Sequence, residues 1–181
     1  GEATKTIRFA FESEKTYLFK INWGSETSTD DKEGEVINSS KHRPNKKSIL
    51  EKIKLFRGEI FQKPPNYSAI KINGKRAYKI ARSGKTPKLE ERKIKIYDFK
   101  LVKIINKNEA EFFVKCQKGT YVRSLARDLG KELGVFGHIS CLKRESVGKF
   151  FKKQSISLDQ IEKLSHYSAK QDIIKPILYP I

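Results

Sequence analysis

Alternating apolar and polar residues predict a set of β-strands. Between Thr16 and Trp23 one apolar set recurs at every second position, which is the period of a strand; its members are Tyr17, Phe19, Ile21 and Trp23. Ile94–Ile105 and Ala110–Cys116 are expected to pair as strands around the turn at Asn106–Asn108. Ile139–Phe150 is expected to be extended as well. The chain should therefore contain a β-sheet.

A longer amphipathic helix is predicted between Thr120 and Leu133. Its apolar residues share one helical face and are Val122, Leu125, Leu129 and Leu133. Thr120 is expected to cap its start, and Gly134 to close it. Shorter helices are expected at Ser48–Phe56, with Asn45 or Ser48 as the N-cap, and at Gly74–Arg82, Leu158–Leu164 and Ala169–Ile174.

These elements predict an α+β domain with a mixed or largely antiparallel sheet flanked by helices. The length of 181 residues suits one domain. Pro64–Pro65 should break regular structure, and Tyr67–Ile72 should be extended. No apolar run approaches the roughly eighteen residues that cross a bilayer, so no membrane partner is expected. The start, Gly1–Lys5, lacks the apolar stretch of a signal peptide; since the chain has no methionine, it is expected to begin inside a longer protein.

The formal net charge of +18 favours a polyanionic partner, because each Lys or Arg that meets a phosphate releases condensed counterions. Anionic membrane is the rival partner, but no basic amphipathic helix stands out. The stretch Asn66–Lys95 holds ten Lys or Arg against two Glu, interrupted by Tyr67, Tyr78 and Gly84. A solvated loop would have this composition, and so would a mobile arm that clamps phosphates and stacks on bases. The arm is the favoured interpretation.

Cysteines and histidines give no sign of a metal site. Cys116 and Cys141 lie in apolar, strand-like surroundings and are interpreted as small buried thiols in a reducing, cytosolic compartment. His138 has no second ligand at metal spacing and is interpreted as a structural hydrogen-bonding residue. Asp30–Asp31 resembles a carboxylate pair but fits a turn whose Asp side chains bond nearby backbone amides.

The densest string of unusual residues is Lys118–Gly130. Gly119 permits a sharp turn from strand to helix, which puts Tyr121 and Arg123 at the helix entrance. On spacing alone, Tyr121 would be an ordinary half-buried aromatic residue and Arg123 a surface cation.

This string resembles the TruB family, whose members make pseudouridine in the T arm of tRNA. The resemblance runs in order over essentially the whole chain. The matching pieces are Gly1–Lys5, Lys15–Tyr17, Gly24–Gly34 with its Thr-x-Thr-x-Asp-x-x-Gly pattern, Phe56–Gly58, Gln62–Pro65, Tyr67–Ala69, Lys71, Gly74, Tyr78, Ala81–Arg82, Gly84, Lys118–Gly130, Leu142–Arg144 and Gly148. Single pieces are weak signals, and their common order makes the match specific.

The resemblance implies a partial pseudouridine synthase catalytic domain over residues 1–181. It implies a thumb-like RNA-binding insertion at about 66–90 and a C-terminal helical segment at about 155–181. The implied reaction is the isomerisation of uridine in the T loop of tRNA, by a cytoplasmic and monomeric enzyme without a cofactor or metal. The uridine is flipped into a pocket, at a cost of a few kcal/mol that stacking and hydrogen bonds must offset.

The resemblance also implies roles for single residues. Tyr17 is expected to stack on the flipped base, with its hydroxyl helping the proton transfer from carbon 5. Arg123 is expected to pair with the catalytic aspartate, because a guanidinium fork orients a carboxylate and keeps it ionised. Tyr121 and Leu142 are expected to line the pocket. The RNA contacts expected in the basic arm are Lys71, Lys75, Arg76 and Arg82.

One departure from the family pattern bears on activity. The catalytic aspartate belongs to a Gly-x-Leu-Asp-Pro-x-Ala-x-Gly type motif, which these 181 residues do not contain. Asp30, Asp31, Asp128 and Asp159 match other family positions. The family's C-terminal RNA-binding extension is also expected to be absent or very short. This polypeptide alone is therefore expected to bind RNA weakly and to catalyse nothing. The rival functions are a non-catalytic RNA-binding or tRNA-folding module, and a ribosome- or polyanion-associated basic protein.

Overall fold

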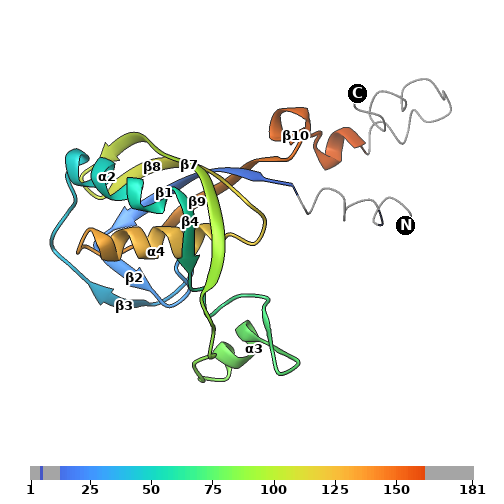
Figure 1. The fold of residues 1–181 in the computed structure, drawn as a ribbon, viewed down its shortest axis with the longest axis horizontal. Helices are drawn as coiled ribbons and strands as arrows, with labels where there is room; N and C mark the ends of the chain where they lie inside the picture. The colour runs from blue at the N-terminus through green and yellow to red at the C-terminus, as the bar shows by residue number, and fades with distance from the viewer. Residues whose placement is uncertain (1–4, 6–12, 162–181) are drawn as a thin grey trace.

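A six-stranded antiparallel sheet forms the centre of the computed structural model, which describes residues 5 and 13–161. The sheet order is β10-β9-β1-β8-β7-β4, so strands that are distant in sequence lie side by side (Figure 1). The bounds are β1 Lys15–Trp23, β4 Gly58–Gln62, β7 Arg92–Asn106, β8 Glu109–Cys116, β9 Gly137–Val147 and β10 Phe150–Phe151. Neighbouring strands of this sheet pair antiparallel throughout the described residues, which confirms the predicted α+β class.

One face of the sheet carries the core. The alternation predicted for β1 is observed, with Phe19, Ile21 and Trp23 buried. The rings of Phe19, Phe99 and Phe112 pack with centroids 5.7–6.0 Å apart. Burial of this aromatic surface is the main stabilising contribution of the sheet face.

Helix α4, Val122–Glu132, lies across this face of the sheet (Figure 1). It approaches β9 closely because Gly130 has no side chain: a Cβ there would lie 2.5 Å from the backbone nitrogen of Gly137. Gly134 has φ +68° and follows the helix, as predicted. The predicted start was wrong, since the N-cap position belongs to Tyr121, not Thr120, and no side chain caps it.

Helix α2, Lys46–Lys52, and the 3₁₀ turn η1, Ile53–Phe56, replace the single helix predicted over Ser48–Phe56. Asn45 is the N-cap, as one of the two predicted options had it, and its side chain accepts a hydrogen bond from the Ser48 amide at 2.9 Å. Ile49, Ile53 and Phe56 are buried against the sheet.

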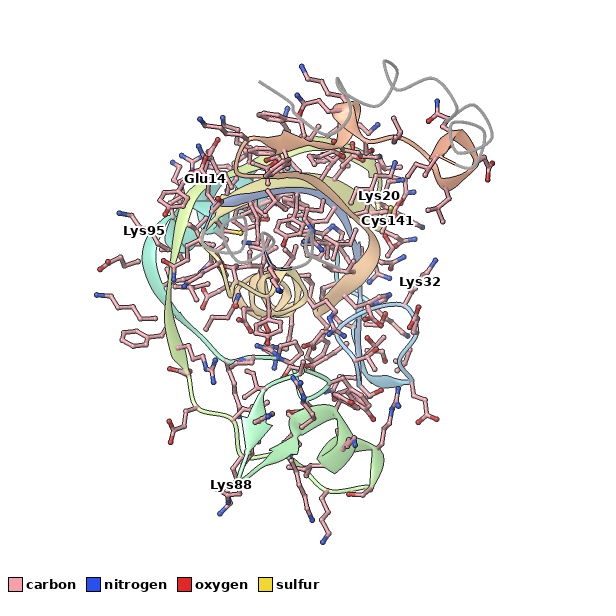
Figure 2. The ribbon with its side chains drawn as sticks, turned by 90° about the vertical axis from the view of Figure 1, so that its right-hand side faces the viewer. Glu14, Lys20, Lys32, Lys88, Lys95 and Cys141 are labelled. Atoms are coloured by element: carbon pink, nitrogen blue, oxygen red, sulfur yellow. The ribbon has the colours of Figure 1, made fainter. Side chains whose placement is uncertain are left out.

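The segment between β4 and β7 leaves the sheet and forms a separate lobe, called the thumb below (residues 63–91; Figure 1). It contains the hairpin β5 Lys71–Ile72 and β6 Lys75–Arg76, followed by α3 Ala77–Arg82. The helix predicted from Gly74 begins three residues later, because Asn73 and Gly74 form the hairpin turn with positive φ. Lys88 lies on the thumb, well away from Lys20 and Lys95 on the sheet (Figure 2).

A small sheet of β2 Ser25–Thr27 and β3 Val36–Ser39 completes the fold, and the turn between them, residues 28–35, docks on β9. The Lys32 amide donates to the Ile139 carbonyl at 2.9 Å, and the Ile139 amide donates to the Asp30 carbonyl at 3.1 Å. These bonds place Asp30 and Asp31 beside the sheet. The 28–35 turn thereby lies within reach of the start of α4.

The C-terminal part of the described chain holds the short 3₁₀ turn η2, Lys152–Gln154, and a helical turn at 158–161. The end of the helix predicted at Leu158–Leu164 and the whole of that predicted at Ala169–Ile174 lie outside the described residues. Within residues 13–161, no helix is long and apolar enough to cross a membrane.

Candidate functional site

The entrance of α4 is held in place by a buried side chain from the end of β4. The Gln62 amide accepts a hydrogen bond from the Tyr121 N–H at 2.9 Å and donates to the Tyr121 carbonyl at 3.1 Å. Gln62 is only 2% exposed. The sharp turn before Tyr121 uses Gly119 with φ +81°, as predicted. Strand β4 and α4 are thus joined where the functional residues begin.

Two more bonds join α4 to the first residue of the thumb. The Ser124 hydroxyl and the Arg127 guanidinium both donate to the Lys63 carbonyl at 2.8 Å. Because one carbonyl accepts from two side chains a helical turn apart, the root of the thumb has a fixed position relative to α4.

Arg123 lies at the centre of the site. Its Nη1 donates to the Asp31 carboxylate and to the Thr29 carbonyl, both at 2.9 Å, and its Nη2 donates to the Tyr67 carbonyl at 2.9 Å. A guanidinium has five N–H donors, so Nε–H and one Nη2–H have no protein acceptor within the described residues. Arg123 therefore joins α4, the 28–35 turn and the thumb, and keeps two donors for a further group.

The turn that receives Arg123 is built for this ion pair. Asp30 has φ +62°, a conformation that Asp tolerates better than most residues. The second oxygen of Asp31, Oδ1, accepts from the Thr29 hydroxyl at 2.6 Å and from the Glu33 amide at 3.1 Å. The prediction that this Asp pair forms a turn with a side chain bonded to a backbone amide is confirmed for Asp31. The Arg123–Asp31 ion pair was not predicted.

A cavity of about 540 Å³ opens beside Arg123, between the thumb and the entrance of α4. Its lining combines aromatic rings, cations and the acidic turn, and consists of Thr29, Asp31, Glu33, Tyr67, Ser68, Ala69, Tyr78, Arg82, Tyr121 and Arg123. The Arg82 guanidinium lies 5.5 Å from the centre of the Tyr78 ring. Aromatic faces and guanidinium groups together suit an unstacked base and its phosphate.

Of the predicted site residues, the structure brings Tyr121, Arg123 and Arg82 together around this cavity. Lys71, Lys75 and Arg76 lie on the thumb hairpin outside the cavity lining. Lys75 is exposed, whereas Arg76 donates to the Ala69 carbonyl at 2.6 Å and so helps to hold the thumb together.

Tyr17 and Leu142 lie on the sheet, on neighbouring strands, and are not part of the cavity lining. Leu142 lies opposite Phe19, so it shares the α4 side of the sheet with Phe19 and Tyr17. Leu142 is 45% exposed, which is unusual for an inward-facing leucine. Burial raises the pKa of the Tyr17 hydroxyl, more than the nearby Arg144 guanidinium lowers it. The phenol therefore stays protonated at neutral pH.

A second ionic network lies on the adjacent face of α4. Arg127 Nη1 donates to Asp30 at 3.0 Å, and its Nε donates to Asp128 at 2.8 Å. Burial raises the pKa of the Asp30 carboxyl to about 6, although Arg127 lowers it. These groups line a cavity of about 320 Å³ together with Glu26, Lys63 and Lys131. The described part of the chain holds no cluster of His, Cys, Asp or Glu that could bind a metal ion.

The cysteines and His138 have the following positions. Cys116 is buried, and burial raises the pKa of its thiol to about 11. Cys141 is partly exposed beside Lys20, which corrects the prediction that both thiols are buried (Figure 2). The His138 ring nitrogen Nδ1 lies 3.1 Å from the Ser25 carbonyl and 3.3 Å from its hydroxyl, in agreement with a structural role.

Solved structures share this architecture. One chain of a Cbf5-Nop10-Gar1 complex superposes with a TM-score of 0.69 at 24% identity, covering 97% of this chain and 43% of that one. A chain of an H/ACA RNP bound to a substrate RNA containing 2'-deoxyuridine gives a TM-score of 0.66 at 20% identity, with 97% and 42% covered. This chain therefore shares the fold of the matched protein chains in these complexes.

Sequence comparison gives the particular family. The model of the TruB family pseudouridylate synthase (N terminal domain) matches residues 1–122, and that of the tRNA pseudouridylate synthase B C-terminal domain matches residues 123–181. The chain belongs to the TruB family. The boundary between the two matches falls inside α4, and β9 beyond it pairs with β1, so both segments contribute to one sheet.

Curated relatives share more than two-fifths of their aligned residues with this chain. The tRNA pseudouridine synthase B of Anaplasma marginale is 43% identical over 180 residues, which cover 99% of this chain and 59% of that protein. The protein of the same name from Bartonella henselae is 46% identical over 162 residues, which cover 90% of this chain and 51% of that protein. The chain thus spans roughly half to three-fifths of the length of these relatives.

Proposed function

We propose that this chain contributes the uridine pocket and the RNA-binding thumb of an enzyme that isomerises uridine to pseudouridine in the T loop of tRNA. The observation that carries the proposal is the hydrogen bonding of the Arg123 guanidinium, which leaves some of its N–H donors unused in the part of the chain that the structure describes. Three of its donors anchor it to Asp31, Thr29 and Tyr67, while Nε–H and one Nη2–H have no acceptor within the described residues, and Arg123 lines the cavity. An immobilised guanidinium with two unused donors suits a carboxylate that must be held in one orientation.

The carboxylate comes from an aspartate in a segment outside residues 1–181, because the family's aspartate motif does not occur among them. Paired with Arg123, this aspartate stays ionised at neutral pH. It takes part in breaking the bond between ribose carbon 1′ and uracil nitrogen 1. The base then turns, carbon 5 bonds to carbon 1′, carbon 5 loses its proton, and nitrogen 1 ends with one. Substrate and product are isomers, so no co-reactant is consumed.

Tyr17, Tyr121 and Leu142 form the rest of the proposed pocket. Tyr17 stacks on the flipped base, and its raised pKa supports a neutral hydroxyl that relays the carbon 5 proton. Leu142 offers apolar surface on the next strand, at 45% exposure. Covering that leucine with a base would offset part of the cost of unstacking the base.

The thumb supplies the remaining affinity. Lys71, Lys75, Arg76 and Arg82 place positive charge around Tyr67 and Tyr78, which suits phosphates on either side of an unpaired loop. The proposed partner is the T-arm stem-loop of tRNA, and the proposed compartment is the cytoplasm. The protein is proposed to act as a monomer.

The alternative is an RNA-binding or tRNA-folding module without catalysis. The ion pair between Arg123 and Asp31 is the observation that favours this module, because the Arg123 guanidinium already has one carboxylate partner. A carboxylate on Nη1 leaves the Nε edge open, however, so the ion pair is compatible with the enzyme as well.

Release of tritium from uridine labelled at carbon 5 distinguishes the two functions. The assay compares chain 1–181 with a longer protein that also contains the aspartate motif, using a T-arm stem-loop as substrate. If the protein is an enzyme, the longer protein should release tritium and chain 1–181 should release none. Tight, selective T-arm binding without release by the longer protein would establish the non-catalytic module. Release by chain 1–181 alone would contradict the need for an outside aspartate.

A further inference from the structure

The lysines of this protein fall into two groups according to their partners. On the outer face of the sheet, opposite α4, lysines lie next to carboxylates within 4.0 Å. These ion pairs are Lys20–Glu109, Lys93–Glu59, Lys103–Glu111 and Lys115–Glu14, and Lys100–Asp98 adds a fifth on β7. Much of the positive charge of the sheet is therefore neutralised locally.

The segment that leads into α2 is different. It reads Lys-His-Arg-Pro-Asn-Lys-Lys over residues 41–47, without an acidic residue. Lys41, Lys46 and Lys47 are exposed, and none of them forms an ion pair with a carboxylate of the described residues. A cluster of lysine ammonium groups without neighbouring carboxylates attracts polyanions far more strongly than lysines that already form ion pairs.

Arg43 fixes this segment to a second basic element. Its Nε donates to the Asn108 side chain at 2.7 Å, and its Nη1 donates to the carbonyls of Ser40 at 2.7 Å and His42 at 2.8 Å. Asn108 follows Lys107 in the turn between β7 and β8. Lys107 is exposed and forms no ion pair with a carboxylate in the part of the chain that the structure describes. Four lysines from two separate parts of the chain are thus presented together. We name Lys41, Lys46, Lys47 and Lys107 the distal lysine patch.

The distal lysine patch and the cavity beside Arg123 lie at opposite ends of α4. The Ser40 amide donates to the Gly24 carbonyl, and the Gly24 amide donates to the carbonyl of Phe136, just beyond the C-terminal end of α4. Tyr121 and Arg123, which line the cavity, lie at the other end. At 1.5 Å per residue, the eleven residues of α4 separate the two by about 16 Å. Figure 1 shows the same separation, with the loop before α2 on the side away from α3 and the thumb.

We propose that the distal lysine patch is a second RNA-binding surface, which contacts backbone phosphates of the tRNA outside the T loop. A lysine ammonium attracts phosphate as a point charge and does not need the planar, bidentate geometry of an arginine guanidinium. Lysines therefore suit contacts with the RNA backbone that do not depend on the base sequence. The proposal deepens the proposed function, on which it rests for the identity of the RNA. The thumb and cavity recognise the loop, and the patch recognises a part of the same molecule that an isolated T-arm hairpin does not contain.

The test compares two RNAs and two variants of chain 1–181. The patch variant replaces Lys41, Lys46, Lys47 and Lys107 with Gln. The matched control replaces Lys20, Lys100, Lys103 and Lys115 with Gln, which removes the same charge from the sheet. The probes are a full-length tRNA transcript and its isolated T-arm hairpin, with Kd measured from low salt to physiological salt. Circular dichroism and thermal unfolding verify that both variants are folded.

The patch variant should lose about tenfold or more in affinity for the full tRNA at physiological salt, and the slope of log K against log salt should fall by about 3. Its affinity for the hairpin should change less than threefold or so, as should that of the control variant for either RNA. An equal loss for hairpin and tRNA, an equal loss in the control, or no loss at all would each overturn the proposal. The wild-type protein tests the proposed function separately, through its preference for the T-arm hairpin over an unrelated hairpin.

Discussion

The side chain of Gln62 and the backbone of Tyr121 exchange two hydrogen bonds across 59 residues of sequence, at 2.9 Å and 3.1 Å. Gln62 is shielded from water, with 2% of its surface exposed, and Tyr121 is half-buried. This pair of hydrogen bonds takes the place of the side-chain cap that α4 lacks, and it fixes the orientation of the first turn of α4. The position of Arg123, two residues further on, depends on it.

Replacing Gln62 with Leu should therefore destabilise the fold. The substitution leaves the Tyr121 N–H without its acceptor, whereas the Tyr121 C=O keeps the hydrogen bond that it accepts from the Leu125 amide at 3.2 Å. We expect a loss of about 1–3 kcal/mol in the free energy of unfolding. Urea denaturation measures this loss. Gln117→Leu is the control, because the Gln117 side chain makes no hydrogen bond within the described residues, and it should change the free energy by less than about 0.5 kcal/mol. Equal values for the two variants would show that the Gln62 bonds do not stabilise the fold.

The ion pair between Asp31 and Arg123 should matter for turnover more than for folding or RNA affinity. In Asp31→Asn, an amide oxygen can still accept from the Thr29 hydroxyl, but an NH₂ group then faces the Nη1 of Arg123. We expect the guanidinium to shift and the turnover number of a longer protein that contains the aspartate motif to fall on the order of 100-fold. Single-turnover kinetics on a T-arm stem-loop measures this. An unchanged rate would mean that Asp31 only shapes its turn.

Asp30 should give the fold a pH dependence of its own. Its pKa of about 6 in the folded state exceeds the value of about 3.9 in an unfolded chain. The folded state thus binds the proton more tightly, so this contribution to stability is complete below about pH 4 and is lost as the pH rises through about 6. The difference in unfolding free energy between wild type and Asp30→Asn should change by up to about 3 kcal/mol between pH 4 and pH 7. A difference that does not vary with pH would show that the Asp30 carboxyl has the same pKa in the folded and the unfolded chain.

Local patterns were enough to predict most of the sheet and α4, because these elements have long and regular apolar periods. Strand β4 was missed, since its five residues, Gly-Glu-Ile-Phe-Gln, have no clear alternation and it lies at the sheet edge. Thr120 was the obvious capping residue by type, yet the bonds from Gln62 to the Tyr121 backbone fix the helix entrance instead. That contact spans 59 residues, and no local pattern signals it.

The candidate site was predictable only through the family resemblance. Spacing alone would have left Arg123 a surface cation, and its partner Asp31 lies 92 residues away in sequence. The resemblance identified Arg123, Tyr121 and Arg82, which do meet around one cavity. It did not indicate Gln62 as a positioning residue or the bond from Arg123 to the thumb at Tyr67. Both depend on how β4, the thumb and α4 pack together.

The thumb makes a prediction about RNA binding that separates two neighbouring cations. Lys75 is exposed and has no hydrogen bond or ion pair within the described residues, whereas Arg76 is bonded to the Ala69 carbonyl. Lys75→Gln should therefore weaken T-arm binding and reduce the salt slope by about 1, without loss of thermal stability. Arg76→Gln should also weaken binding, partly by loosening the hairpin. An unchanged slope for Lys75→Gln would remove this lysine from the interface.

The most direct test of the whole account is the Arg123→Ala variant of a longer protein that contains the aspartate motif, with turnover and tRNA affinity measured side by side. If Arg123 holds the catalytic carboxylate, the single-turnover rate of pseudouridine formation should fall by about 100- to 1,000-fold, while Kd for the T-arm stem-loop changes only a few-fold. Arg123→Lys should not restore the rate, because an ammonium cannot reproduce the fork. A large loss of affinity with an unchanged rate would make Arg123 a phosphate contact and contradict the account.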